Sequence, residues 1–320
     1  MLVSRNVAAT MARHVVVLLN AKAGTNAAAQ TREQIAKVRA ALEAHGATAD
    51  VRAVEGRHLA AEAKRAAAET GVDAVVAGGG DGTQSAVAGA LAGTDVPMGV
   101  LPLGTLNHFA KDLGLPQELA EAAAVVATGV PRPVDVGRVN GRVFVNNSSI
   151  GVYPHVVRHR DQLRETLGHG KWYAMLIAVL NLFTRRMPRV HLRLAVNGEE
   201  HEHRTPFVFV GNNVYELELL TLGQRKRLDA GQLCLYFTPR SGRLAMVRLA
   251  LRALFNRLRQ DRDFNAVCSG DVWIDTKKKR LNVAMDGEVE PMDSPLHYQI
   301  WPAALRVIVP AEGASPAGSG

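Results

Sequence analysis

The chain of 320 residues contains 47% hydrophobic and 21% charged residues, a balance that suits a globular protein with two domains. Its formal net charge of +8 favours an anionic partner, and the charge alone leaves nucleotide, nucleic acid and an acidic membrane surface open. Nucleic acid is disfavoured because aromatic residues make up only 5% and no helix-turn-helix, zinc-finger or RRM signature is present.

The first part of the chain alternates apolar strand patterns with helical patterns. Strands are predicted at 14–20, 49–54, 73–77 and 98–101, and helices at 26–44, 58–70, 84–91 and between 107 and 127. This alternation is typical of βαβ units, in which helices cover both faces of a parallel sheet. We therefore predict an α/β domain with a parallel sheet over residues 1–130.

The run Gly78-Gly79-Gly80-Asp81-Gly82-Thr83 follows the third predicted strand and precedes the helix expected from Gln84. Glycines lack a Cβ and can adopt positive φ, so successive backbone N–H groups can converge on an anion at a helix N-terminus. Asp81 would repel phosphate unless a divalent cation lay between them, which favours a magnesium nucleotide as the ligand. The Walker A sequence is absent, so the chain is not a P-loop NTPase. Taken alone, the run could also be a tight βα turn in a dehydrogenase-like fold.

Three loops follow the carboxyl ends of predicted strands: residues 20–25, the glycine run, and residues 103–107. Ligands of open α/β sheets bind at this edge, so we expect the three loops to line one crevice. Lys22 is a candidate phosphate contact, with a solvated loop lysine as the alternative. Thr83 is expected to cap the following helix while its hydroxyl faces phosphate. Asn107 is expected either to contact the nucleotide or to hold its loop.

The pattern changes near residue 128, where prolines precede a strand at 134–139 and an Asn140-Gly141 pair typical of a type I′ hairpin turn. Further strands are predicted at 142–147, 191–196, 207–210, 233–237, 271–274, 281–285 and 305–309. We therefore predict a mainly antiparallel β domain over residues 131–310. The last residues, 311–320, are Gly, Ala, Ser, Pro and one Glu, and are expected to form a disordered tail.

Asp286 is the candidate general base. A magnesium triphosphate suggests phosphoryl transfer, which needs in-line positioning, neutralised charge and a group that accepts the proton of the acceptor hydroxyl. Asp286 follows a predicted strand and precedes Gly287, which allows a sharp turn that presents the carboxylate at a cleft edge. We expect a low dielectric and the nearby Glu288 to make Asp286 a stronger base. The alternative is a plain Asp-Gly turn between two strands.

Several of these motifs resemble one known family. Gly79-Gly80-Asp81-Gly82-Thr83 resembles the signature of the diacylglycerol kinase catalytic-domain family, which includes bacterial diacylglycerol kinases, YegS-like lipid kinases and sphingosine kinases, and NAD kinases share this signature. The block from Leu101 to Ala110, with Pro102-Leu103-Gly104-Thr105-Leu106-Asn107, resembles the lipid-kinase side alone. Similar elements follow in the expected order at 20–25, 146–151, 228–233 and 285–288, so the resemblance spans roughly residues 14–309.

The resemblance implies an NAD kinase-like parallel sheet that binds nucleotide, a β-sandwich-like second domain for the lipid substrate, and ATP and Mg²⁺ as cofactors. It implies catalytic roles for Asp286 and Glu288. Nucleotide-binding roles are implied for residues of the three loops: Asn20, Lys22, Gly78, Gly79, Gly80, Asp81, Gly82, Thr83, Gly104, Thr105 and Asn107.

Two further acids are implied to act near a metal. Asp135 resembles an acidic position in a metal-linked hydrogen-bond network, and Asp229 resembles a structural magnesium ligand that braces the β domain. The chain departs from the family pattern at Ala21, which replaces a proline, at His108, where an acidic residue is common, and at Ala230, which interrupts the usual Asp-Gly.

Two basic stretches could meet a membrane. Residues 158–189 carry seven Lys/Arg and two acids around the apolar run Trp172–Phe183, and residues 243–259 place arginines between apolar residues at helical spacing. Such helices bind anionic headgroups but also pack onto a β-sheet, and we expect core packing with the arginines facing the membrane. No run reaches the roughly 18 to 20 apolar residues of a transmembrane helix. His201-Glu202-His203 is expected to lie in a solvated hairpin, with a metal site as the alternative.

The compartment is expected to be the cytoplasm. Cys234 and Cys268 are too few for a disulfide framework or a zinc site and suit a reducing environment. Residues 1–13 do not resemble a signal peptide.

Together these features predict an ATP- and magnesium-dependent lipid kinase that acts at an anionic membrane surface and transfers the γ-phosphate to a hydroxyl of a lipid such as diacylglycerol. The first alternative is an NAD kinase-like phosphotransferase, which shares the glycine run. The second is a non-catalytic lipid- or nucleotide-binding protein, in which Asp286 would be replaceable.

Overall fold

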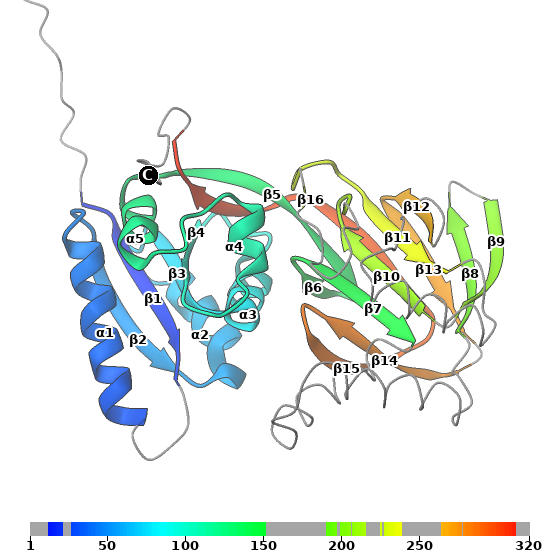
Figure 1. Cartoon of the computed structure of the whole chain (residues 1–320), viewed down its shortest axis with the longest axis horizontal. Helices are drawn as coiled ribbons and strands as arrows, with labels where there is room; N and C mark the ends of the chain where they lie inside the picture. Colours follow the sequence, from blue (N-terminus) through cyan, green and yellow to red (C-terminus); the bar gives the residue numbers. More distant parts are fainter. Residues whose placement is uncertain are drawn as a thin grey trace, which may run out of the picture. The chain divides into compact units, whose positions relative to one another are not determined.

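The structure is a computed structural model that describes residues 12–21, 27–151, 190–196, 199–205, 207–215, 225, 227–238, 264–276 and 278–311. The chain divides into two compact units (Figure 1): residues 1–132 with 305–320, and residues 133–304. The boundary predicted at 130 falls after Arg132 in the structure. The strand residues 305–309, which we expected in the second domain, belong to the first unit.

The first unit is built on a parallel sheet in the order β2-β1-β3-β4, and the end of β16 continues it beyond β4. Its strands are β1 (His14–Asn20), β2 (Thr48–Val54), β3 (Ala74–Gly79), β4 (Met98–Pro102) and, from residue 305 on, β16 (Leu296–Val309). Its helices are α1 (Ala27–Glu43), η1 (Gly56–His58), α2 (Leu59–Ala67), α3 (Asp81–Leu91), α4 (His108–Asp112) and α5 (Leu119–Thr128). The alternation of strands and helices is therefore as predicted.

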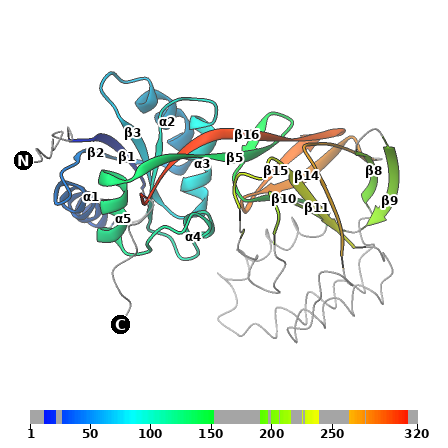
Figure 2. The ribbon, with the colours of Figure 1, turned by 90° about the horizontal axis from the view of Figure 1, so that it is seen from above.

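Helices cover both faces of this sheet, which explains why its central strands are apolar throughout. On one face, Leu42 of α1 and Val126 of α5 join a buried cluster with Val17 and Val76 of the sheet. On the other face lies α2, which packs against α3 (Figure 2). The strand order reverses at β1, because β2 lies on one side of it and β3 on the other. In such sheets the ligand site lies at the carboxyl ends of these strands.

The second unit is an antiparallel β-sandwich, as predicted. One sheet, in the order β12-β11-β10-β7-β14-β15, packs against a second sheet that contains β16, β13, β8 and β9, with β5 and β6 beside β16. Buried residues of both sheets, such as Ile150, Val210, Ile274 and Tyr298, form one core cluster. The strands are β5 (Val130–Val139), β6 (Arg142–Phe144), β7 (Asn147–Gly151), β8 (Val190–Val196), β9 (Glu199–Thr205), β10 (Phe207–Asn212), β11 (Leu233–Phe237), β12 (Asn265–Ser269), β13 (Asp271–Asp275), β14 (Arg280–Met285) and β15 (Glu288–Asp293).

The hairpin predicted at Asn140-Gly141 is confirmed, because both residues have the positive φ of a type I′ turn, 47° and 80°. The strand expected at 142–147 reaches only the first residue of β7, and strands β9, β12 and β15 were not predicted. β9 (EEHEHRT) has no apolar residue, β12 is mostly exposed, and β15 contains Pro291. Apolar alternation, the signal used to find strands, is weak in all three.

The two cysteines are joined in the structure, contrary to the expectation from their number. Cys234 of β11 lies directly opposite Cys268 of β12, and a disulfide links them. Because β12 was not recognised as a strand, nothing in the sequence pattern placed these two residues opposite each other.

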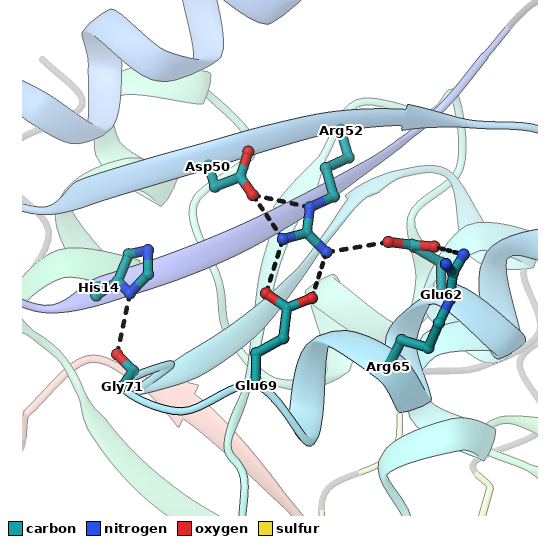
Figure 3. Close-up of polar contacts among 7 residues, drawn as sticks. All are labelled: His14, Asp50, Arg52, Glu62, Arg65, Glu69 and Gly71. Carbon is teal, nitrogen blue, oxygen red and sulfur yellow. Dashed lines mark hydrogen bonds and ion pairs between the residues drawn. The ribbon is translucent and has the colours of Figure 1, made fainter.

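An ion-pair network ties the edge strand β2 to α2 and to the segment that follows α2 (Figure 3). The Arg52 guanidinium donates to both carboxylate oxygens of Glu69, each at 2.7 Å, and also contacts Asp50 and Glu62, which in turn pairs with Arg65. These contacts raise the pKa of Arg52, chiefly through Glu69, and the hydrogen bond from Arg52 lowers the pKa of Glu69.

We predict that Arg52→Met lowers Tm at pH 7 by about 2 to 4 °C, because one cation holds three carboxylates together. Since the folded-state pKa of Glu69 is lowered, its contribution is present above the unfolded pKa and is lost as pH falls through the folded pKa. The difference in Tm between variant and wild type should therefore shrink below about pH 4. Arg57→Met, which removes a single exposed pair with Glu55, is the control and should change Tm much less. Equal effects of the two substitutions, measured by thermal unfolding across pH, would contradict the network interpretation.

Candidate functional site

The glycine run forms the junction between β3 and α3. β3 ends at Gly79, Gly80 precedes the helix, and α3 begins at Asp81, three residues earlier than predicted. Asp81, Gly82 and Thr83 therefore form the first helical turn, whose N–H groups have no partner within a helix. Such a turn binds anions through its N–H groups and the helix dipole. The predicted capping role of Thr83 is wrong, because Gly80 occupies the cap position and Thr83 is the third residue of the helix.

The glycines are required by close packing rather than by unusual φ. A Cβ on Gly78 would overlap Leu19, and a Cβ on Gly79 would overlap the side chain of Thr83. A Cβ on Gly104 would overlap the Cα of Gly80, so the two loops touch backbone to backbone. None of these glycines has positive φ, in contrast to the use of glycine that we expected from the sequence. The missing side chains allow two strand ends and their loops to meet at one place.

Asn107 holds the second loop. It adopts the left-handed conformation, with φ 50° and ψ 48°, and its side chain is buried. Its Oδ1 accepts the N–H of Gly104 at 3.1 Å, and its Nδ2 donates to the carbonyls of Gly104 and Pro102 at 3.0 and 3.2 Å. Of the two roles considered for Asn107, these bonds support the loop-holding one.

Asp81 connects the two loops. Its Oδ1 accepts the backbone N–H of His108, the first residue of α4, at 2.7 Å. A charged acceptor at the start of a helix is favourable because the first N–H groups have no intrahelical partner. The contact uses only the backbone of His108, so it does not depend on which side chain stands there.

The other predicted nucleotide residues of this unit differ in exposure. Asn20 ends β1 and is exposed, as are Gly82, Gly104 and Thr105, whereas Thr83 is buried. Exposed backbone at these loop positions can contact a ligand. Lys22 lies outside the described residues.

Asp286 occupies the two-residue turn between β14 and β15. Met285 pairs with Glu288, and Asp286 and Gly287 have φ of 47° and 91°, so the turn is a tight hairpin of the type that Asp-Gly favours. The positive φ at position 287 explains why a glycine stands there. Glu288 is exposed and begins β15. This is also the arrangement expected if the motif were a plain turn, so the function of Asp286 depends on what its carboxylate contacts.

The Asp286 carboxylate is surrounded by backbone N–H groups of a segment about 140 positions earlier. Its Oδ2 accepts the N–H of Val145 at 2.9 Å, and its Oδ1 accepts those of Asn146 at 2.8 Å and Asn147 at 3.1 Å. The N–H of Asp286 returns to the carbonyl of Asn147 at 2.9 Å. Hydrogen bonds to a carboxylate favour its ionised form. This effect is opposite to the stronger basicity that we expected from the sequence.

Asp135 and Asp229 have different partners in the structure. Asp135 is buried, and its two carboxylate oxygens accept the N–H groups of Gly231 at 2.7 Å and Ala303 at 2.9 Å. Asp229 is exposed and contacts Arg227 at 3.0 Å. Over the described ranges, no group of three or more His, Cys, Asp or Glu side chains comes together. Asp135 thus braces the loop around Gly231 by direct hydrogen bonds, and the metal-linked roles that the resemblance implied for Asp135 and Asp229 stay predictions.

The remaining predictions have different outcomes. His203 lies on β9, in the antiparallel pair with β8, and its ring packs against Phe237 with centroids 4.7 Å apart. The basic stretches at 158–189 and 243–259 lie outside the described residues. In the part of the chain that the structure describes, no helix is long and apolar enough to cross a membrane.

Sequence reasoning missed one group of residues near Asp286. Arg225, Asn212 and Tyr215 are buried and contact the segment that holds its carboxylate. A run such as Gln224-Arg225-Lys226-Arg227 resembles an exposed basic loop, so no local signal distinguishes the one buried arginine.

Comparisons with known proteins agree with this architecture. Residues 14–139 match the diacylglycerol kinase catalytic domain, and residues 146–309 match the YegS C-terminal NAD kinase beta sandwich-like domain. A glycine-rich α/β part followed by this β-sandwich defines a class of kinases distinct from the P-loop enzymes. The chain belongs to the diacylglycerol kinase catalytic-domain family of YegS-like lipid kinases.

Individual relatives are similar over most of their length. The chain is 29% identical over 258 residues to the "Probable lipid kinase YegS-like" of Klebsiella pneumoniae (strain 342), covering 77% of this chain and 81% of the relative. It is 29% identical over 286 residues to the "Probable lipid kinase YegS" of Escherichia coli O9:H4 (strain HS), covering 85% and 89%. A diacylglycerol kinase crystal structure from Bacillus anthracis str. Sterne has the same fold, with a TM-score of 0.64, 20% identity, and coverage of 93% and 96%.

We predict that Gly104→Ala weakens ATP binding about tenfold or more, because the added methyl group would push the second loop away from Gly80. Titration calorimetry with ATP measures the change. Gly270→Ala is the matched control: its Cβ would lie 3.4 Å from Ile300, an ordinary contact, and its φ is not positive. Wild-type ATP affinity in Gly104→Ala would show that the contact between the loops does not shape the nucleotide site.

We predict that Asp135→Asn lowers the free energy of unfolding by about 2 to 3 kcal/mol, because the buried carboxylate that accepts two backbone N–H groups is lost. Urea denaturation measures this. Since direct hydrogen bonds brace the loop, adding EDTA or magnesium should leave the Tm of the ligand-free wild type unchanged. A fall of several degrees with EDTA would instead show that a metal stabilises the fold.

Proposed function

We propose that this protein is an ATP- and magnesium-dependent lipid kinase that transfers the γ-phosphate to a hydroxyl of a membrane lipid such as diacylglycerol. Membership of the lipid kinase family supplies the class of reaction and ATP as the phosphate donor. The observation that carries the proposal further is the pairing, in one chain, of an anion-binding helix start with a carboxylate held rigidly at a hairpin turn. The family match favours this function over that of an NAD kinase.

In the proposed reaction the first unit binds the nucleotide. The N–H groups of the first turn of α3 and the exposed backbone at Gly104 and Thr105 contact the phosphates, with Asn20 and Lys22 from the loop after β1. Magnesium would arrive with ATP and neutralise phosphate charge, and the partly exposed carboxylate of Asp81 is the acidic group of this loop that suits it. Asp81 also keeps the two loops together through His108.

Asp286 accepts the proton of the lipid hydroxyl. The hydroxyl oxygen forms a bond to the γ-phosphorus, the bond from the γ-phosphorus to the bridging oxygen breaks, and ADP leaves. Glu288, two positions further along the hairpin, adds negative charge near the acceptor. The three N–H groups fix the orientation of the Asp286 carboxylate, so that its oxygens meet the hydroxyl in one geometry.

The lipid is proposed to be reached at an anionic membrane surface on the cytoplasmic side, where ATP is available, by peripheral association. The net charge of +8 supports attraction to such a surface. Incubation with labelled ATP and a total lipid extract, followed by identification of the labelled lipid, tests the substrate class. A parallel incubation with NAD tests the alternative acceptor. Labelled NADP without labelled lipid would overturn the proposal.

We predict that Asp286→Asn lowers kcat for lipid phosphorylation by about 10²- to 10⁴-fold while ATP affinity stays close to wild type. Asp293→Asn, on the same hairpin but 84% exposed, is the control and should keep the wild-type kcat. Thermal unfolding of both variants shows whether the hairpin is intact. Full activity of a folded Asp286→Asn protein would show that Asp286 is not the proton acceptor of the reaction.

A further inference from the structure

The segment Val145–Asn147 connects Asp286 to a second set of buried groups. Its three N–H groups donate to the Asp286 carboxylate. The carbonyl oxygens of Val145 and Asn146 point to other partners. Each peptide group has its C=O and the next residue's N–H at opposite ends, so a partner at the oxygen affects the strength of the N–H as a donor.

Arg225 is the charged partner on the carbonyl side. The residue is only 3% exposed, and its Nη1 donates to the carbonyl of Val145 at 2.6 Å and to that of Asn212 at 3.2 Å. Its Nη2 donates to the side-chain oxygen of Asn146 at 2.9 Å, and its guanidinium lies 5.4 Å from the ring centre of Tyr215. Arginine stays protonated even when buried, so a fixed positive charge lies against this segment.

The peptide group between Val145 and Asn146 therefore has a cation at its oxygen and a carboxylate at its N–H. Both polarise the peptide in the same direction, and hydrogen bonds in such chains strengthen one another. The peptide group between Asn146 and Asn147 is arranged in the same way, except that the donors at its oxygen are neutral. The carbonyl of Asn146 accepts the Tyr215 hydroxyl at 2.9 Å and the N–H of Asn212 at 3.0 Å, while the N–H of Asn147 donates to Asp286.

We propose that Arg225 and Tyr215 are positioning residues that act on Asp286 through the peptide groups of Val145–Asn147. They fix these N–H groups in place and increase their strength as donors, which keeps the Asp286 carboxylate ionised and oriented as the proton acceptor. The proposal rests on the function proposed above, and it adds residues that touch neither nucleotide nor lipid.

The sign of the effect follows from the direction of polarisation. Removing a partner from the carbonyl side weakens the N–H donors, so the carboxylate binds a proton more readily and the acid limb of the activity profile moves to higher pH. Among the described residues, the charged side chains next to this arrangement include Arg225, which contacts Val145, and Glu288 and Glu290 of the Asp286 hairpin, the last paired with Arg142 at 2.6 Å. The variants below change only the first of these charges.

The experiment compares Tyr215→Phe and Arg225→Met with the wild type. The pH dependence of kcat/KM is measured with a short-chain soluble diacylglycerol. The acid limb should move up by about 1 pH unit in Arg225→Met and by a smaller amount in Tyr215→Phe, with rates approaching wild type at higher pH. Arg225→Lys keeps the charge and should show little of this shift, with its acid limb close to that of the wild type. Tyr298→Phe loses a buried hydroxyl that contacts Ser148 instead, and should show no shift.

A second measurement is independent of activity. The carboxyl carbon of Asp286 is followed by NMR across pH, and its signal is assigned by its loss in Asp286→Asn. In each variant, the midpoint of the Asp286 titration should move to higher pH by the same amount as the acid limb of the activity profile. If Arg225→Met does not fold, Tyr215→Phe against Tyr298→Phe decides the question by both measurements.

The outcomes separate this proposal from the proposed function. An inactive wild type, or an active Asp286→Asn, overturns the lipid-kinase role while the NMR titration still tests the link to Arg225. An active wild type with unmoved midpoints in the folded variants overturns the positioning role. A rate that falls equally at every pH, with the acid limb in place, also overturns it, because that is the result of a purely structural defect.

Discussion

The loops at the start of α3 and the hairpin of Asp286 both depend on one kind of interaction, a hydrogen bond from a backbone N–H group to an aspartate carboxylate. Asp81 holds His108, Asp135 holds Gly231 and Ala303, and Asp286 holds three successive residues from Val145. Each bond links segments separated by 27 to 168 positions in the sequence. An ionised acceptor makes a stronger hydrogen bond than a neutral one. Because the aspartate side chain is short, the two segments that it joins have little freedom to move relative to each other. The loops are thus fixed by acidic side chains and main chain.

This arrangement changes the meaning of the acidic residues in the motifs. From sequence, a cation was expected beside Asp81 because a carboxylate next to phosphate is unfavourable, and the family resemblance implied a metal-linked network for Asp135. In the structure, backbone N–H groups are compensating partners of both carboxylates. For Asp135 both carboxylate oxygens are used in this way, whereas for Asp81 the bond to His108 coexists with partial exposure at the helix start.

The sequence predicted the first unit well because its strands are buried on both faces and its helices alternate with them. The positions of the three loops followed from strand ends. What could not be predicted is which groups meet: the overlap that a Cβ on Gly104 would cause with Gly80 and the bonds of Asn107 depend on the loop path. In the second unit, β9 and β15 were missed because polar residues in edge strands carry no apolar alternation. The partners of Asp286 lie about 140 positions away, and Arg225 lies in a basic run, so neither has a local signal.

A carboxylate surrounded by N–H groups is a weak base, and phosphoryl transfer is a reaction in which a weak base suffices. In a loose transition state, the bond to the leaving oxygen is largely broken before the new bond is formed, so the attacking hydroxyl becomes acidic only late. What is needed early is an oriented acceptor for the hydroxyl proton, because orientation removes entropy from the barrier. The bonds from Val145, Asn146 and Asn147 supply that orientation. In the proposed mechanism these bonds also favour the ionised carboxylate of Asp286, which is the form that accepts a proton.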